Sequence, residues 1–136
     1  MQGSKNLKII DSIDHLVLTV ADIDQSCAFY SQALGLEVIT FGGGRKALKF
    51  GKQKINLHQQ GREYQPHAKH PAPGSSDLCF VASVPLQDVM QHLRRSKIEI
   101  LEGPVLRTGA LGPITSIYFR DPDGNLLEVS NYGKTV

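Results

Sequence analysis

The order of the expected elements is the feature that most constrains the fold, because one series of strand, helix and three strands occurs twice along the chain. The first series predicts a helix at 21–36 and strands at 14–20, 36–41, 45–51 and 54–59. The second predicts a helix at 85–93 and strands at 76–83, 98–104, 114–120 and 125–131. Each half is too small to bury its own apolar face, so the halves are expected to pack onto a partner half.

The last hairpin carries the most informative side chain. Residues 121–124 read Asp-Pro-Asp-Gly, a tight turn in which Pro fixes φ, Gly supplies a positive φ and Asp bonds its own backbone. The turn fixes the register of the hairpin, and with it the face on which Glu128 lies. Glu128 lies between Leu127 and Val129, and a carboxylate within an apolar strand needs a partner.

Polar side chains that could bind a cation lie opposite the apolar sets of four strands. In the first strand, for example, Leu16, Leu18 and Val20 share one face and His15 lies on the other. If helices cover the apolar faces and both halves curl around one axis, the polar side chains meet in one cavity. Two imidazoles and two carboxylates directed at one cavity suit a divalent cation. The candidates are His15, His58, Asp77 and Glu128, with Asn56 on the same face as His58.

Composition excludes several classes of partner. The 136 residues carry a net charge of +2, which fits one compact domain. Charges are spread without long blocks of one sign, so no nucleic-acid partner is expected. No segment approaches the roughly 20 apolar residues that cross a bilayer, and the first residues lack a signal-peptide stretch, so a cytoplasmic protein without a membrane partner is expected. Cys27 and Cys79 are expected to be buried reduced thiols.

The stretches DHLVLTVADIDQSCAFYSQALGLEV, GSSDLCFV and YFRDPDGNLLEVSN resemble the vicinal oxygen chelate superfamily, which includes glyoxalase I, extradiol dioxygenases, fosfomycin-modifying enzymes and bleomycin-binding proteins. The resemblance covers residues 10–132, and within the superfamily the chain is most similar to small glyoxalase-domain-containing and virulence-associated glyoxalase-like proteins. It implies an α+β fold in which two tandem βαβββ modules form a cupped mixed sheet. Module one would span about 11–60 and module two about 75–132, joined by a loop at 61–74, within a single domain 1–136.

The resemblance also implies one divalent metal ion (Zn, Ni, Mn or Fe(II)), bound by the first and last strands of each module. By position, His15 and Asp77 match the first-strand ligands, and Glu128 matches the closing glutamate. The fourth place is occupied by Asn56 in the usual alignment, but His58, two residues later on the same face, is favoured because an amide is a poor metal donor. Asp77 is itself a departure, since glyoxalase I, extradiol enzymes and fosfomycin transferases usually have His there.

Short members of the superfamily often combine two chains, which implies a homodimer here. His15 and His58 of one chain would then face Asp77 and Glu128 of the other.

These features favour a metal-dependent glyoxalase-like enzyme of lyase or isomerase type, such as a lactoylglutathione lyase. The metal would polarise vicinal oxygens of a small substrate, and Glu128 would move a proton. Arg45, Lys49 and Arg107 are expected near the mouth of the cup, where they would hold an anionic substrate. The alternative from a different class is a metal-free small-molecule binding or resistance protein of the bleomycin-binder type. An extradiol dioxygenase and a thiol transferase are less favoured, because Asp77 replaces their His.

Overall fold

The computed structural model describes residues 6–134, which form two modules of the same element order. Module one consists of β1 (His15–Val20), α1 (Ile23–Leu34), β2 (Glu37–Phe41), β3 (Arg45–Phe50) and β4 (Gln53–Gln59). Module two consists of β5 (Asp77–Val81), α2 (Leu86–Arg95), β6 (Glu102–Gly109), β7 (Gly112–Arg120) and β8 (Leu126–Tyr132). The α+β fold of two βαβββ modules, predicted from the sequence, is confirmed.

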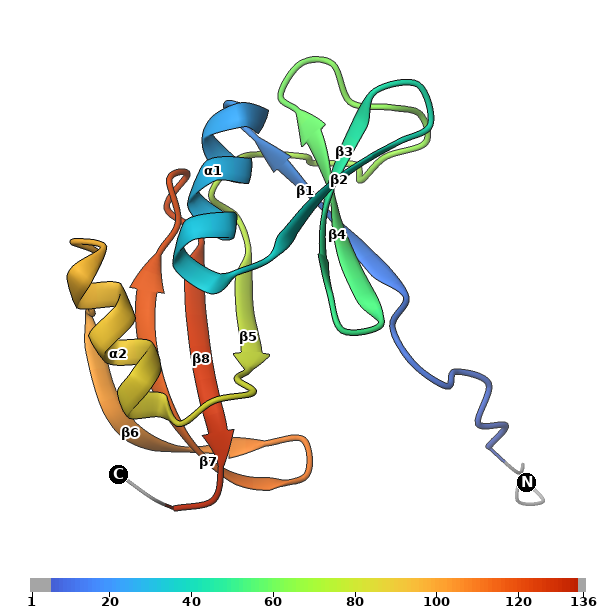
Figure 1. Ribbon diagram of the computed structural model, residues 1–136. Helices are drawn as coiled ribbons and strands as arrows, with labels where there is room; N and C mark the ends of the chain where they lie inside the picture. Colours follow the sequence, from blue (N-terminus) through green and yellow to red (C-terminus); the bar gives the residue numbers. More distant parts are fainter. Residues whose placement is uncertain (1–5, 135–136) are drawn as a thin grey trace.

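Each module folds its strands into a four-stranded mixed sheet. The strand order is β1-β4-β3-β2 in the first sheet and β5-β8-β7-β6 in the second. β1 is parallel to β4, and β5 is parallel to β8, whereas the remaining neighbours are antiparallel. β1 and β5 therefore form one open edge of each sheet, and Figure 1 shows the two sheets as separate layers at an angle to each other.

Local signals in the sequence explain both helices. Asp22 caps α1 by accepting a 3.0 Å hydrogen bond from the Gln25 backbone N–H, and Gly35 ends it in the left-handed conformation with a φ of 69°. Pro85 precedes α2, where the absence of a backbone donor is tolerated. Each helix buries the apolar stripe that its periodicity predicts, so both helices lie on the apolar faces of the sheets.

One hydrophobic core joins the two modules. Side chains of α1, α2 and both sheets belong to the same buried cluster, and α1 lies between the sheets in Figure 1. Phe29 of α1 lies with its ring centroid 6.4 Å from that of Phe119 on β7, and His92 of α2 contacts the Gln32 carbonyl of α1 at 2.7 Å. Because the apolar faces are used for this joint, the opposite, more polar face of each sheet is left for other contacts.

The predicted turn at 121–124 is part of the joint between the modules. Its Asp121 carboxylate accepts hydrogen bonds from the backbone N–H groups of Asp123 and Asn125, both at 2.9 Å, and from the Tyr30 hydroxyl at 2.6 Å. The Asp123 carboxylate accepts a 3.2 Å bond from the Ala21 N–H at the end of β1. The turn thus fixes the last hairpin and also clamps it to module one.

The strand predicted at 98–104 is wrong in its position. β6 begins at Glu102, and its register is set by the tight turn that pairs Gly109 with Gly112. Ile98 and Ile100 instead pack against the core in an irregular segment after α2. Their alternation with polar residues comes from this packing and not from a sheet. Within residues 6–134 no helix is long and apolar enough to cross a membrane.

Candidate functional site

The polar face of module one carries His15, Asn56 and His58 at different heights along the sheet. In the parallel β1–β4 pair, His15 is opposite Lys54, Val17 is opposite Asn56, and His58 lies two residues farther along β4. Asn56 therefore lies on the same face as His15 and is offset from it by two residues along the strands. His58 is displaced from His15 by four residues, which is about 13 Å along a strand. Since each ligand must come within roughly 2.2 Å of a shared ion, the register favours Asn56 over His58 as the neighbour of His15.

Module two repeats this arrangement at the corresponding places. Cys79 is opposite Glu128 in the parallel β5–β8 pair, and Asp77 lies two residues before Cys79 on the same face. Asp77 and Glu128 are thus related to each other as His15 and Asn56 are related in module one. The register makes Asn56 the structural counterpart of Glu128.

A single chain does not bring the four predicted metal ligands together. Among residues 6–134, no group of three or more His, Cys, Asp or Glu side chains lies close enough to hold a metal ion. His15 and His58 lie on the polar face of the first sheet, and Asp77 and Glu128 lie on that of the second. The two polar faces lie opposite the apolar faces that contribute to the shared core.

The chemistry of the donors nevertheless fits a divalent cation. His15 is about 43% exposed, and its Nδ1 lies 2.8 Å from the Asp14 carboxylate. This contact lowers the pKa of Asp14. A carboxylate on one ring nitrogen is how metal-binding histidines are commonly oriented. In the described part of the chain no hydrogen bond occupies the Nε2 of His15.

Glu128 is the end point of a chain of hydroxyl groups. Ser116 donates a 2.6 Å hydrogen bond to Oε2 of Glu128, and the Ser116 and Ser130 hydroxyls are 2.6 Å apart. The thiol of Cys79 lies 3.3 Å from the Ser130 hydroxyl. Both serines are fully buried. Because the Ser116 hydrogen is committed to the carboxylate, the Ser130 hydroxyl donates to Ser116 and the thiol donates to Ser130.

The expectation of a buried Cys79 is wrong, whereas Cys27 is buried as predicted. Cys79 shares the polar face of β5 with Asp77, and the apolar side chains Leu78 and Phe80 take the core side. Partial burial still raises the pKa of the Cys79 thiol, so it is protonated at neutral pH and able to donate.

The predicted substrate-binding residue Arg107 lies near Glu128. Its side chain donates 3.0 Å and 3.2 Å hydrogen bonds to the hydroxyl of Tyr118 and the carboxylate of Glu102. Glu128, Arg107 and Tyr118 line a cavity of about 430 Å³ together with Cys79. The polar face of module two therefore offers a carboxylate, a phenol and a guanidinium to one ligand.

The other two predicted substrate-binding residues lie on β3. Lys49 is exposed, and its ammonium donates a 3.1 Å bond to the Gly51 carbonyl at the β3–β4 turn. Arg45 lies against His58, with Nη2 at 3.4 Å from Nε2 of the imidazole. Burial, together with the Arg45 charge, lowers the pKa of His58, so the ring is neutral at pH 7.

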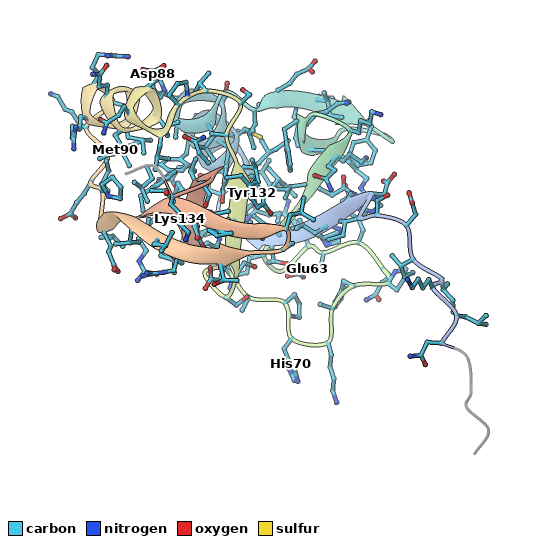
Figure 2. The ribbon with its side chains drawn as sticks, turned by 90° about the horizontal axis from the view of Figure 1, so that it is seen from below. Glu63, His70, Asp88, Met90, Tyr132 and Lys134 are labelled. Carbon is cyan, nitrogen blue, oxygen red and sulfur yellow. The ribbon has the colours of Figure 1, made fainter. Side chains whose placement is uncertain are left out.

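The loop between the modules covers one end of the first polar face. It spans residues 60–76, called here the connecting loop, and it places the Tyr64 ring 5.6 Å from that of His58. Figure 2 shows the loop, with His70 near its outermost point, on the side of the molecule opposite α2, which carries Asp88 and Met90. His58 and Asn56 are therefore buried, at 3% and 6% exposure, although they lie on the polar face.

Four residues of this surface escaped the sequence analysis: Ser116, Tyr118, Ser130 and Tyr64. The first three had a usable signal, since Ser130 follows Glu128 by two residues and Ser116 and Tyr118 share one face of β7. Tyr64 had none, because it lies in a loop without periodicity.

Comparison with known proteins supports the architecture. The family model of the Glyoxalase/Bleomycin resistance protein/Dioxygenase superfamily matches residues 12–129. The virulence protein STM3117 of Salmonella typhimurium is 59% identical over 124 residues, which cover 91% of this chain and 86% of that protein. Its crystal structure superposes with a TM-score of 0.91 and covers 92% of this chain and 99% of the other.

Two further relatives are similar over most of the chain. The glyoxalase domain-containing protein RDO1 of Mycosarcoma maydis is 56% identical and matches 90% of this chain and 69% of its own. The structure of a lactoylglutathione lyase from Agrobacterium tumefaciens has a TM-score of 0.70 at 26% identity, and covers 92% of this chain and 96% of that chain.

Proposed function

Because this chain belongs to the Glyoxalase/Bleomycin resistance protein/Dioxygenase superfamily, we propose that it is a divalent-metal-dependent enzyme of glyoxalase type. Its active site is shared between two copies of the chain. The observation that carries the proposal is the matched register of the two modules, which sets His15 with Asn56 on one polar face and Asp77 with Glu128 on the other. A pair from each face supplies the set of ligands.

Two copies are needed because one chain keeps the pairs on separate sheets. The sheets have open edges at β1 and β5, which suits edge-to-edge contact with a partner. Residues 6–14 leave the body of the molecule in Figure 1 and carry Leu7, Ile9, Ile10 and Ile13, each more than 60% exposed. Such an apolar arm is costly in water and suits burial against a second copy.

Each residue has a role in the proposed site. His15 with Asp77 and Glu128 of the partner subunit would hold the ion, and the fourth place falls to Asn56, which is offset from His15 by two residues in the β1–β4 register. When bound, a divalent ion would supply Lewis-acid polarisation of vicinal substrate oxygens. Glu128 takes up and returns a proton, with the Ser116 hydroxyl holding its carboxylate in place. Lys49 and Arg107 would hold an anionic part of the substrate.

The proposed ligands and base best suit the reaction of a lactoylglutathione lyase, the enzyme named in one of the similar structures. A proton is removed and returned within one substrate, so a single carboxylate base suffices. The exposed thiol of Cys79 is protonated and hydrogen-bonded, and therefore adds no nucleophile that would favour a different group-transfer reaction.

Mixing two inactive variants tests the shared site. His15→Ala and Glu128→Ala chains, carrying different tags, are co-expressed and the heterodimer is isolated. If ligands come from both chains, one cup of the heterodimer has lost both residues and the other is intact. Elemental analysis should then find one metal ion per heterodimer and none in either homodimer. No ion in the heterodimer, with two per wild-type dimer, would place all ligands within one chain and reject the shared site.

The second candidate is a metal-free binding protein that sequesters a small molecule. The amide of Asn56 at the place equivalent to Glu128 favours it, because an amide is a weaker metal ligand than a carboxylate. This function requires that wild-type protein, incubated with Zn, Ni, Mn or Fe(II) and then desalted, retains no stoichiometric ion. Stoichiometric metal that is lost in Glu128→Ala would exclude it.

A further inference from the structure

Arg45 lies in a setting that is unusual for a guanidinium. Its Cζ lies 4.3 Å from the ring centroid of Tyr64 and 5.1 Å from that of Phe41, so the cation contacts two aromatic rings. Within the described part of the chain, no carboxylate forms a salt bridge with it. The positive charge is therefore fixed in position but left without a neutralising partner.

The contact with His58 determines which atoms donate. A guanidinium has only donors, so Nε2 of His58 accepts from Nη2 of Arg45 at 3.4 Å. The hydrogen of the neutral ring is then on Nδ1. Both this Nδ1–H and the Nε–H of Arg45 are buried and have no hydrogen-bond partner. A negatively charged ligand would satisfy these buried donors and neutralise the guanidinium.

A cavity reaches the His58 side of this contact. His58, which is 97% buried, forms part of the wall of a cavity of about 490 Å³ between β1, β4 and the connecting loop. Glu63 lies near enough for its charge to act on His58, but its carboxylate accepts a 3.1 Å bond from the Gly61 N–H and forms no ion pair with Arg45. The connecting loop thus covers the donors without satisfying them.

We propose that Arg45 and His58 form a subsite for a small oxyanion group of the ligand, such as a carboxylate or a phosphate. The Nε–H of Arg45 donates to an oxygen of this group, the Nδ1–H of His58, on the ring edge away from Arg45, donates to a separate acceptor of the ligand, and Tyr64 moves aside to admit them. If the ligand is the substrate of the proposed enzyme, the inference rests on the proposed function. The substrate would then carry a negative charge about 7 Å along β4 from Asn56. As a binding site, it lies within one module and needs no metal.

The same contacts make His58 a hydrogen-bond donor to the proposed anionic ligand and not a ligand of the divalent metal ion. The lone pair of Nε2 faces a guanidinium, and a divalent cation at that distance from Arg45 would be repelled.

The experiment is an NMR titration of the full chain after treatment with a chelator. Inorganic phosphate and, separately, acetate are added at constant ionic strength, and the Nε–H resonances of the arginines are followed together with the backbone amide of His58, which reports binding in every variant. The Arg45 signal should shift to saturation at millimolar concentration. Binding should weaken roughly tenfold or more in Arg45→Met, whereas Arg62→Met, which removes an exposed guanidinium from the connecting loop, should bind as the wild type does.

A linear shift without saturation for both anions in the wild type overturns the proposal, as does an equal loss in Arg62→Met and Arg45→Met. If Arg45→Met does not fold, Arg45→Lys keeps the charge but not the fork of donors. Affinity equal to wild type in that variant would reject the role of the guanidinium. Because the titration contains no metal, failure of the heterodimer test leaves its result unchanged, and failure of the titration leaves the metal site unchanged.

Discussion

The hydroxyl of Tyr30 donates a 2.6 Å hydrogen bond to the carboxylate of Asp121, and both side chains are buried, at 0% and 5% exposure. The bond joins α1 of module one to the β7–β8 turn of module two. It lies within the apolar contact between the modules, where the low dielectric strengthens a satisfied polar pair. The orientation of the two polar faces depends on this joint.

Replacing Tyr30 with Phe should therefore destabilise the protein by about 1.5–3 kcal/mol, the cost of losing a hydrogen bond to a charged group in a buried place. Urea unfolding followed by circular dichroism measures the change. Tyr132→Phe is the matched control, because the Tyr132 hydroxyl only accepts a bond from the Leu111 N–H at a more exposed position. That variant should stay within about 0.5 kcal/mol of wild type. Equal values for the two variants would show that the buried bond adds nothing.

The stability of the fold should fall at alkaline pH because of the same tyrosine. Burial, followed by the hydrogen bond to Asp121, raises the pKa of Tyr30 far above its ordinary value of 10.0. Above pH 10 the unfolded chain loses this proton and the folded chain keeps it, so the contribution is complete below pH 10 and decreases as pH rises. The free energy of unfolding should decline more steeply in wild type than in Tyr30→Phe above pH 10. Parallel curves would contradict the assignment.

Gly74 should be sensitive to alanine because it packs against the turn at 121–124. Its φ is +80°, and an added Cβ would overlap the backbone carbonyl of Asp123. Gly61 has nearly the same φ, +83°, but open space around it. Both alanine variants are destabilised by about 1 kcal/mol because alanine disfavours the left-handed backbone. Only Gly74→Ala is destabilised further by the overlap with Asp123. A midpoint of thermal unfolding that falls no further in Gly74→Ala than in Gly61→Ala would contradict this packing.

Most of the architecture could be predicted because it is encoded locally. The alternation in β1 and β4, the Asp22 cap, the Gly35 stop and the turn at 121–124 each determine structure within a few residues. The strand predicted at 98–104 is misplaced because Ile98 and Ile100 alternate with polar residues where an irregular segment packs against the core. The sequence alone does not show that this segment reaches the core. Tertiary packing produced the same pattern that a strand would.

The candidate site could be predicted less completely, because it depends on pairing between strands. The sequence indicated His15, Asp77 and Glu128 as polar residues on strand faces, but it does not state which residue lies opposite which. That information separates Asn56 from His58, and it appears only in the β1–β4 register. The burial of His58 beneath Tyr64 was equally hidden, since loop residues have no period to follow.

Ser116 should control metal affinity through Glu128. Removing a hydroxyl that orients a ligating carboxylate commonly lowers metal affinity by roughly 10–100-fold, so Ser116→Ala should show a loss of this size in a competition titration with a chromogenic chelator. Thr115→Val is the control, because it also removes a buried hydroxyl but one that bonds the Gly133 carbonyl on the other face. Equal metal affinity in Ser116→Ala and wild type would mean that the hydroxyl does not position the ligand.

The fourth metal ligand can be decided by exchanging an amide for a carboxylate. Asn56 occupies the place in module one that Glu128 occupies in module two, so Asn56→Asp should supply a charged ligand and raise the affinity for Zn or Mn roughly tenfold or more. His58→Asn should leave metal affinity within about twofold, because His58 lies two residues farther along and faces Arg45. Isothermal titration of both variants at one pH makes the comparison. If His58 is a ligand, the pattern inverts: His58→Asn loses the ion and Asn56→Asp changes little, which would contradict both the register argument and the assignment of His58 to an anion.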